Sequence, residues 1–147
     1  MQPKKSSAPQ APVAKRDKLD KEAYERLSQF RYRLRCFQRV SEDICQAHGL
    51  TSLQYQLLLH VKGAPGREWA LIGELAERLQ AKHHGVVALV DRCEKAELVK
   101  RLPGREDRRQ VEVHLCPKGQ ELVRTLAKLH QTELQGLRAM LDRVEWN

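Results

Sequence analysis

Apolar residues recur at helical spacing in a long stretch that begins near residue 20. Leu27, Phe30, Leu34, Phe37 and Ile44 follow one another at steps of three, four or seven residues. Such steps place side chains on one face of an α-helix, because the helix turns once in about 3.6 residues. The pattern therefore predicts a long amphipathic helix over residues 20–47.

The middle of the chain shows the same helical period in shorter stretches. Thr51 and Gln54 have the spacing of a capping box, which predicts the start of a helix just after Thr51. Residues 70–79 and the residues that follow Ala81 each carry one apolar face, so two further helices are expected there. The first of these helices is expected to bury Leu57, Leu58, Leu59 and Val61, the second Leu71, Leu75, Ala76 and Leu79, and the third Val86, Leu89, Val90 and Cys93.

The apolar period then changes from about 3.6 to about 2, which is typical of β-strands. One such stretch covers residues 98–102, and in a second stretch Val111, Val113 and Leu115 alternate with polar residues. Pro103 and Gly104 predict a turn after the first strand, so the two strands form a hairpin. Helical spacing returns at Pro117, a residue suited to the first position of a helix, and predicts a last helix over residues 117–144.

This order of elements indicates a mainly α-helical protein with a small β-wing. The fold class is a winged helix-turn-helix, over residues 50–116, between two long helices. Each long helix measures roughly 40 Å at 1.5 Å per residue, and the middle of the chain can cover only part of it. Exposed apolar stripes favour association, so we expect a homodimer in which the helices 20–47 and 117–144 pair with a second copy. Residues 1–18 are expected to be a disordered basic tail, and residues 19–147 a single domain.

Positive charge is concentrated at the tip of the predicted hairpin. The chain has 27 Lys and Arg against 19 Asp and Glu, a formal net charge of +8, and five basic residues fall between Lys100 and Arg109. Only Glu106 and Asp107 oppose them in that stretch. A local cationic tip on such a fold favours a polyanionic partner such as nucleic acid.

Other function classes lack their signals in this sequence. No apolar run is long enough for a membrane span and the first residues lack the apolar stretch of a signal peptide, so we expect a cytoplasmic protein without a membrane partner. Cys36, Cys45, Cys93 and Cys116 show no C-x-x-C pair and no zinc spacing with histidine, which predicts reduced cysteines and no metal site. No phosphate-binding loop and no nucleophile motif is present, so neither an enzyme nor a cofactor is expected.

The stretch from Gly49 to Gly119 resembles the MarR family of bacterial transcriptional regulators. The similarity is carried by GLTSLQYQLLLHV for the second helix of that family, IGELAERL for the third, VVALVDRCEKAELVKR for the recognition helix, and DRRQVEVHLCPKG for the wing. The predicted long helices match the dimerisation helices of the family, so that residues 19–147 resemble one MarR-type domain. The resemblance implies a homodimeric, sequence-specific DNA-binding transcriptional regulator, which we expect to be a repressor acting at a pseudo-palindromic operator.

The resemblance also implies which residues touch DNA. The N-terminal part of the recognition helix faces the major groove, and the wing presents the arginine of a D-x-R motif, here Arg109, to the minor groove. Asp107 would orient the wing, and Arg105 and Arg108 would contact phosphates. The expected DNA-binding residues are Lys82, His83, His84, Gly85, Val87, Ala88, Arg92, Arg101, Arg105, Asp107, Arg108 and Arg109. Glu97 replaces the glycine that closes the recognition helix in relatives, so it must adopt a positive φ or end the helix differently.

The sequence says less about how DNA binding is regulated. Many members of that family release DNA when a small aromatic or carboxylate ligand binds between the long helices and the winged helix. Two alternatives stay open: a thiol redox sensor at Cys36, which arginines surround in the sequence, and a protein-interaction scaffold that uses the winged helix. The candidate ligand-binding residues near that junction are Arg31, Arg35, Tyr55, His60 and Trp69.

Overall fold

The computed structural model describes residues 19–143, and the elements within them follow the predicted order with one addition. The predicted tail of residues 1–18 and the predicted helix end at residue 144 lie outside the described residues. In chain order the elements are α1 (Lys21–Ala47), α2 (Ser52–Lys62), β1 (Trp69–Leu71), α3 (Ile72–Leu79), α4 (His83–Lys95), β2 (Val99–Pro103), β3 (Val111–Leu115) and α5 (Pro117–Leu141).

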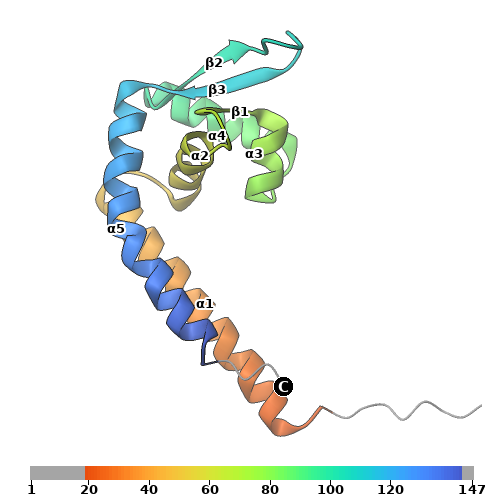
Figure 1. Ribbon diagram of the computed structural model, residues 1–147, viewed down its shortest axis with the longest axis vertical. Helices are drawn as coiled ribbons and strands as arrows, with labels where there is room; N and C mark the ends of the chain where they lie inside the picture. Colours follow the sequence, from red (N-terminus) through yellow and green to blue (C-terminus); the bar gives the residue numbers. More distant parts are fainter. Residues whose placement is uncertain (1–18, 144–147) are drawn as a thin grey trace, which may run out of the picture.

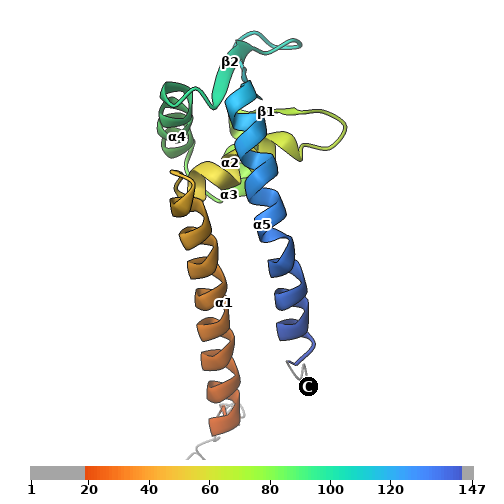
Figure 2. The ribbon, with the colours of Figure 1, turned by 90° about the vertical axis from the view of Figure 1, so that its left-hand side faces the viewer.

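The molecule consists of a globular head and two long helices that extend from it (Figures 1 and 2). The head contains α2, α3, α4 and the strands, and the β2–β3 hairpin projects from its far side. Helices α1 and α5 lie alongside each other and are antiparallel, because α1 runs towards the head and α5 runs away from it. No helix within residues 19–143 is long and apolar enough to span a lipid bilayer.

The predicted start of the second helix is confirmed by its hydrogen bonds. The hydroxyl of Thr51 accepts a bond from the Gln54 backbone N–H at 3.1 Å, and the Gln54 side chain accepts one from the Thr51 N–H at 2.9 Å. This reciprocal pair satisfies two N–H groups that have no partner inside the helix. The preceding residue, Leu50, is buried, and α2 is thereby fixed at its entry.

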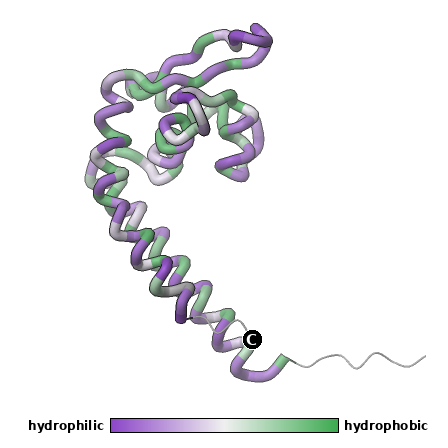
Figure 3. Tube along the Cα trace, in the orientation of Figure 1, coloured by the Kyte–Doolittle hydropathy of each residue, from purple (hydrophilic) through white to green (hydrophobic). Residues whose placement is uncertain are grey.

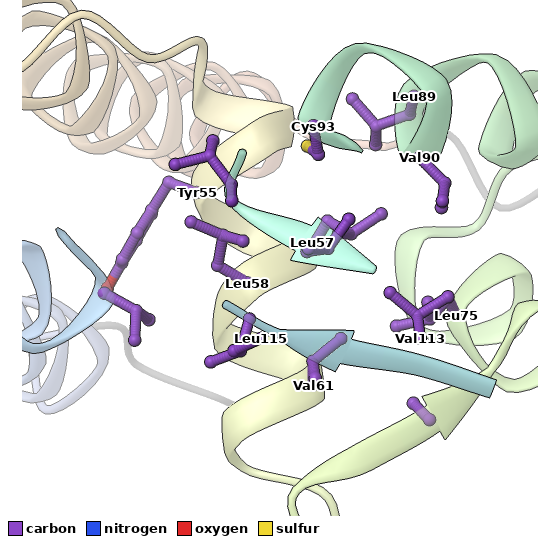
Figure 4. Packing of buried hydrophobic residues seen from close by; sticks show 14 of the residues in the cluster. Tyr55, Leu57, Leu58, Val61, Leu75, Leu89, Val90, Cys93, Val113 and Leu115 are labelled. Atoms are coloured by element: carbon purple, nitrogen blue, oxygen red, sulfur yellow. The ribbon is translucent and has the colours of Figure 1, made fainter. Parts of the chain in front are cut away.

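Helix α2 lies at the centre of the head and supplies much of its core (Figure 4). Leu57, Leu58 and Val61 are fully buried there. The prediction that Leu59 is buried with them is wrong, because its side chain is 38% exposed. Leu59 lies two residues from both Leu57 and Val61, which is more than half a helical turn, so it points to the opposite side of α2. The core is completed by Leu75 from α3, Val90 and Cys93 from α4, and Val113 from β3.

The sheet has a third strand that the sequence analysis missed. Its strands are antiparallel in the order β1-β3-β2, and Ala70 and Leu71 of β1 pair with Val113 and Glu112. The predicted helix over 70–79 is therefore shorter than expected and begins at Ile72, which is buried. A strand of three residues is too short to show an alternating pattern. The helical spacing of the residues that follow it therefore placed the start of the predicted helix two residues too early.

The long helices leave apolar side chains uncovered, as expected for one copy. Along α1, Leu34, Phe37 and Ile44 are half-buried, whereas Leu27 is 58% exposed. Hydrophobic and hydrophilic segments alternate along both helices (Figure 3). The N-terminal end of α5 packs closely on the head. There the backbone of Gly119 lies so near the Leu98 carbonyl that a Cβ at this position would collide with it. Only glycine permits this approach of two backbones.

Candidate nucleic-acid interface

Helix α4 presents its first turn to solvent and buries its opposite face. Lys82 is the residue that caps its N-terminus, and His83, His84, Gly85, Ala88 and Arg92 are exposed along it. Val86, Leu89, Val90 and Cys93 anchor the other face in the core, and Val87 lies between the two faces. The expected recognition-helix residues therefore lie on one accessible surface, apart from the half-buried Val87.

The end of α4 is closed by Glu97 with a positive φ of 60°. This is the first of the two outcomes expected where relatives carry glycine, and it costs about 1 kcal/mol relative to glycine. The Leu98 backbone N–H donates to the carbonyl of Cys93 at 2.9 Å, which ends the helix and directs the chain into β2.

The tip of the hairpin is a short loop closed by backbone hydrogen bonds. The Gly104 N–H donates to the Gln110 carbonyl at 2.8 Å, and the Gln110 N–H donates to the Asp107 carbonyl at 3.0 Å. A Cβ at Gly104 would collide with the Asp107 carbonyl, so this position requires glycine. The tip is mostly hydrophilic (Figure 3). We call residues 104–110 the wing loop.

Asp107 and Arg109, the two residues of the D-x-R motif, are in direct contact within the wing loop. Asp107 Oδ1 accepts from the Arg109 backbone N–H at 3.0 Å and from its Nε at 3.2 Å. These bonds hold the pKa of Asp107 below its ordinary value. The Arg109 side chain is nevertheless 91% exposed. Asp107 therefore orients an arginine that remains free to contact a partner.

The guanidinium of Arg101 is bound to other residues of the protein. Its guanidinium forms ion pairs with Asp91 and, at 3.3 Å, with Glu94, and it donates to the Val87 carbonyl at 3.3 Å. All three partners belong to α4, whereas Arg101 lies on β2. This expected DNA-binding residue thus connects the wing to the recognition helix.

Arg105 is paired with a buried carboxylate that the sequence analysis did not single out. Glu112 of β3 is only 2% exposed and accepts hydrogen bonds from Arg105 Nε at 3.2 Å and NH2 at 3.1 Å. His114 Nε2 lies 3.0 Å from Oε1, the oxygen that also accepts from Arg105 Nη2. These bonds, led by those of Arg105, lower the pKa of Glu112 to about 2. The sequence did contain a signal for this pair: a glutamate lies in the predicted strand directly after the arginine-rich loop.

We expect replacement of Glu112 by glutamine to make the protein less stable only where this carboxylate is charged. The folded-state pKa of about 2 lies below the ordinary 4.5, so its stabilising effect is complete above about pH 4.5 and is lost between pH 4.5 and 2. Urea unfolding of wild type and Glu112→Gln at pH 7, 5 and 3 should show a stability difference that shrinks at the lowest pH. The matched control is Glu121→Gln, which removes an exposed glutamate paired with Arg124 on α5. A difference that does not change with pH would contradict this assignment.

The residues expected to line an effector site belong to three elements: two lie on α1, two on α2 and one on β1. Arg31 and Arg35 are exposed on α1, and His60 is half-buried on α2. Tyr55 is buried and stacks on His130 of α5 with ring centroids 4.3 Å apart. Trp69 lies instead beneath the wing, where Arg105 packs over its ring.

A groove of about 330 Å³ lies between α1 and α5, and none of those five residues lines it. Its lining includes Cys36, which is exposed, and Glu133, one of whose carboxylate oxygens is buried without a hydrogen-bond partner. Burial raises the pKa of Glu133. Within residues 19–143 no group of three or more His, Cys, Asp or Glu side chains is placed to hold a metal ion.

A helix-turn-helix of α3 and α4, followed by a β-hairpin whose loop carries exposed arginines, defines a winged helix-turn-helix protein. Residues 48–110 match the sequence model of the MarR family, and this stretch contains the recognition helix and the wing loop. This part of the chain is therefore similar to the MarR family of transcriptional regulators, in agreement with the resemblance found in the sequence. The predicted fold class is confirmed by the winged-helix fold that the chain shares with solved structures of that family.

Individual relatives agree with this assignment. An uncharacterized HTH-type transcriptional regulator of Bacillus subtilis (strain 168), YsmB, is 33% identical over 66 residues, which are 45% of this chain and 45% of that protein. The match thus spans less than half the length of that relative. The crystal structure of AbsC, a MarR family regulator from Streptomyces coelicolor, has a TM-score of 0.74 at 23% identity and covers 87% of this chain and 84% of its own. A cysteine-to-serine variant of E. coli MarR, complexed with operator DNA, has a TM-score of 0.65 at 19% identity, with 84% and 95% covered.

Proposed function

We propose that this protein is a homodimeric transcriptional regulator that binds double-stranded DNA at a pseudo-palindromic operator and represses transcription there. The observation that carries the proposal is that one protomer presents two accessible surfaces. These are the exposed first turn of α4 and the wing loop with its 91% exposed Arg109. A solved relative with this fold, E. coli MarR, is in complex with operator DNA.

The two surfaces suit the two grooves of B-DNA. A helix of the size of α4 fits the major groove, where Lys82, His83 and His84 would lie near base edges and phosphates. Arg109 would enter the adjacent minor groove, whose negative potential is strongest in narrow A·T-rich segments. Arg108, also exposed, would contact a phosphate.

The long helices support the proposed dimer. Val40 on α1 and Leu134 on α5 are 51% and 70% exposed, and the groove between the two helices is partly apolar. A second copy that covers this face would remove those side chains from water. Two recognition helices related by a twofold axis would then enter successive major grooves, roughly 34–36 Å apart.

Selection of bound duplexes from a random pool at physiological salt tests this proposal. We expect a two-half-site sequence to be enriched and its affinity to fall at least about a thousandfold between 50 and 200 mM salt, because neutralised phosphates release counterions. A scrambled duplex of equal length is the control and should bind far more weakly. Enrichment of no sequence together with a flat salt dependence would reject DNA recognition and favour the protein-interaction scaffold.

Regulation of this binding is the second part of the proposal. A small aromatic or carboxylate ligand would release DNA if it preferred the protomer geometry that cannot bind both half-sites. A thiol switch is the competing mechanism, and it is supported by the exposure of Cys36 in the groove beside Arg33. Release by peroxide that Cys36→Ser prevents identifies the thiol switch, whereas release by an added ligand in that variant identifies the effector. Either role is exercised in the cytoplasm, where chromosomal DNA lies.

A further inference from the structure

We propose that Glu112 is a positioning residue for DNA recognition, which fixes the wing loop through Arg105 and so determines where Arg109 meets the minor groove. This inference rests on the proposed function, because it assigns a cause to the placement of the wing. Glu112 itself is only 2% exposed and would not touch DNA.

The first step is the attachment of the wing loop to the sheet. Both carboxylate oxygens of Glu112 are used by Arg105: Oε2 accepts from the backbone N–H at 2.9 Å and from Nε at 3.2 Å, and Oε1 accepts from NH2 at 3.1 Å. Main chain and side chain of the same residue are thereby bound to β3. A carboxylate that is 2% exposed requires such partners, because an unpaired buried charge is strongly unfavourable.

The second step is the platform beneath Arg105. The ring of Trp69 lies under its guanidinium at 4.5 Å and under that of Arg67 at 4.1 Å. Trp69 belongs to β1 and pairs in the sheet with His114 of β3, which also contacts Glu112. The cluster of Glu112, Arg105, Trp69 and His114 therefore joins β1, β3 and the wing loop at one point. We call this cluster the wing anchor.

The third step runs from the wing anchor to the tip. Arg105 directly follows Gly104, whose N–H is bonded to the Gln110 carbonyl, and the Gln110 N–H is bonded to the carbonyl of Asp107. Asp107 in turn holds Arg109 through its backbone N–H and its side chain. An arginine held in this way needs less ordering when it binds, so the complex forms with higher affinity. Arg105, expected from the sequence to contact phosphate, acts on this interpretation inside the protein.

A double-mutant cycle on the duplex selected above separates this role from a general loss of stability. Glu112→Gln alone is expected to weaken binding about tenfold, whereas in an Arg109→Ala background the same change should weaken it less than about threefold, because the arginine it positions is already absent. Glu121→Gln is the matched control and should leave affinity unchanged in both backgrounds. Equal effects of Glu112→Gln in the two backgrounds, or none in either, would overturn the inference.

Amide hydrogen exchange provides a readout that does not depend on DNA. In Glu112→Gln the amides of Arg105 and Arg109 should exchange at least about tenfold faster, while those of the α2 core keep their protection. Unchanged exchange in the wing loop would overturn the anchor even if affinity fell. If the wild type selected no duplex, the proposed function would fail, and faster loop exchange would still establish the anchor as a feature of the protein.

Discussion

Replacement of Arg109 by alanine is expected to weaken binding of the selected operator about a hundredfold without loss of the fold. The side chain is 91% exposed and its partner Asp107 is also accessible to solvent, so the ion pair contributes little to folding. A specific arginine contact to DNA contributes roughly 1–3 kcal/mol, and a dimer has two of them, so a loss of about 3 kcal/mol or two decades of affinity follows. Fluorescence anisotropy with the selected duplex measures this change.

Arg108 provides the control for the same experiment. It is an exposed arginine one residue away, and it is expected to contact phosphate only. Arg108→Ala should weaken binding to all duplexes alike and reduce the salt dependence by about one contact per protomer, whereas Arg109→Ala should also relax the preference at the flanking base pairs. Wild-type affinity and preference in Arg109→Ala would remove the wing from the recognition mechanism.

Glutamates in place of one exposed apolar residue on α1 and one on α5 are expected to convert the proposed dimer to a monomer. In an isolated protomer Val40 and Leu134 are largely exposed, so Val40→Glu combined with Leu134→Glu should leave the fold intact. In a dimer each carboxylate would be buried without a partner, at a cost of roughly 3–5 kcal/mol. Light scattering should therefore show a dimer dissociation constant raised a hundredfold or more, and operator affinity should fall with it because one protomer reaches only one half-site.

The matched control for this change lies on the head. Leu53 of α2 is 51% exposed and lies outside the long helices, so Leu53→Glu should remain dimeric and bind DNA as the wild type does. A double variant that stays dimeric at micromolar concentration would exclude this face as the dimer interface. Circular dichroism of both proteins would verify that helix content is retained.

Patterns with many repeats were predictable from the sequence, whereas single contacts were not. The apolar stripe of α1 and the alternation of β3 each repeat over several residues, and the capping box of Thr51 has a fixed spacing to Gln54. Strand β1 rests on three residues and was merged with α3. A run of arginines showed where positive charge lies but not which charges are already paired, so Arg101 and Arg105 were placed at DNA although both have carboxylate partners within the protein.

The same limit applies to the candidate effector residues. Tyr55 and Trp69 were chosen for their position near a junction, and each is engaged by a different aromatic or cationic neighbour. Helical and strand periods give the face on which a side chain lies, but a pocket depends on the rotation of one element against the next. Those rotations are set by packing across long sequence separations, for which a single sequence contains no periodic signal.

The close approach of Gly119 to Leu98 joins the long helix α5 to the head at its N-terminal end. At that point the Cys116 backbone N–H donates to the Leu98 carbonyl at 2.9 Å and Lys118 Nζ donates to the Ala96 carbonyl at 3.2 Å. These bonds attach the first turn of α5 to the end of the recognition helix. The 25 residues of α5 form an arm of roughly 37 Å, and a tilt of about 5° displaces its far end by about 3 Å relative to the head. In the proposed dimer, an equally small tilt would change the spacing of the two recognition helices by several times the tolerance of a hydrogen bond. A ligand that tilts α5 in the proposed dimer would therefore act through the length of this helix, whatever the chemistry of the site that binds it.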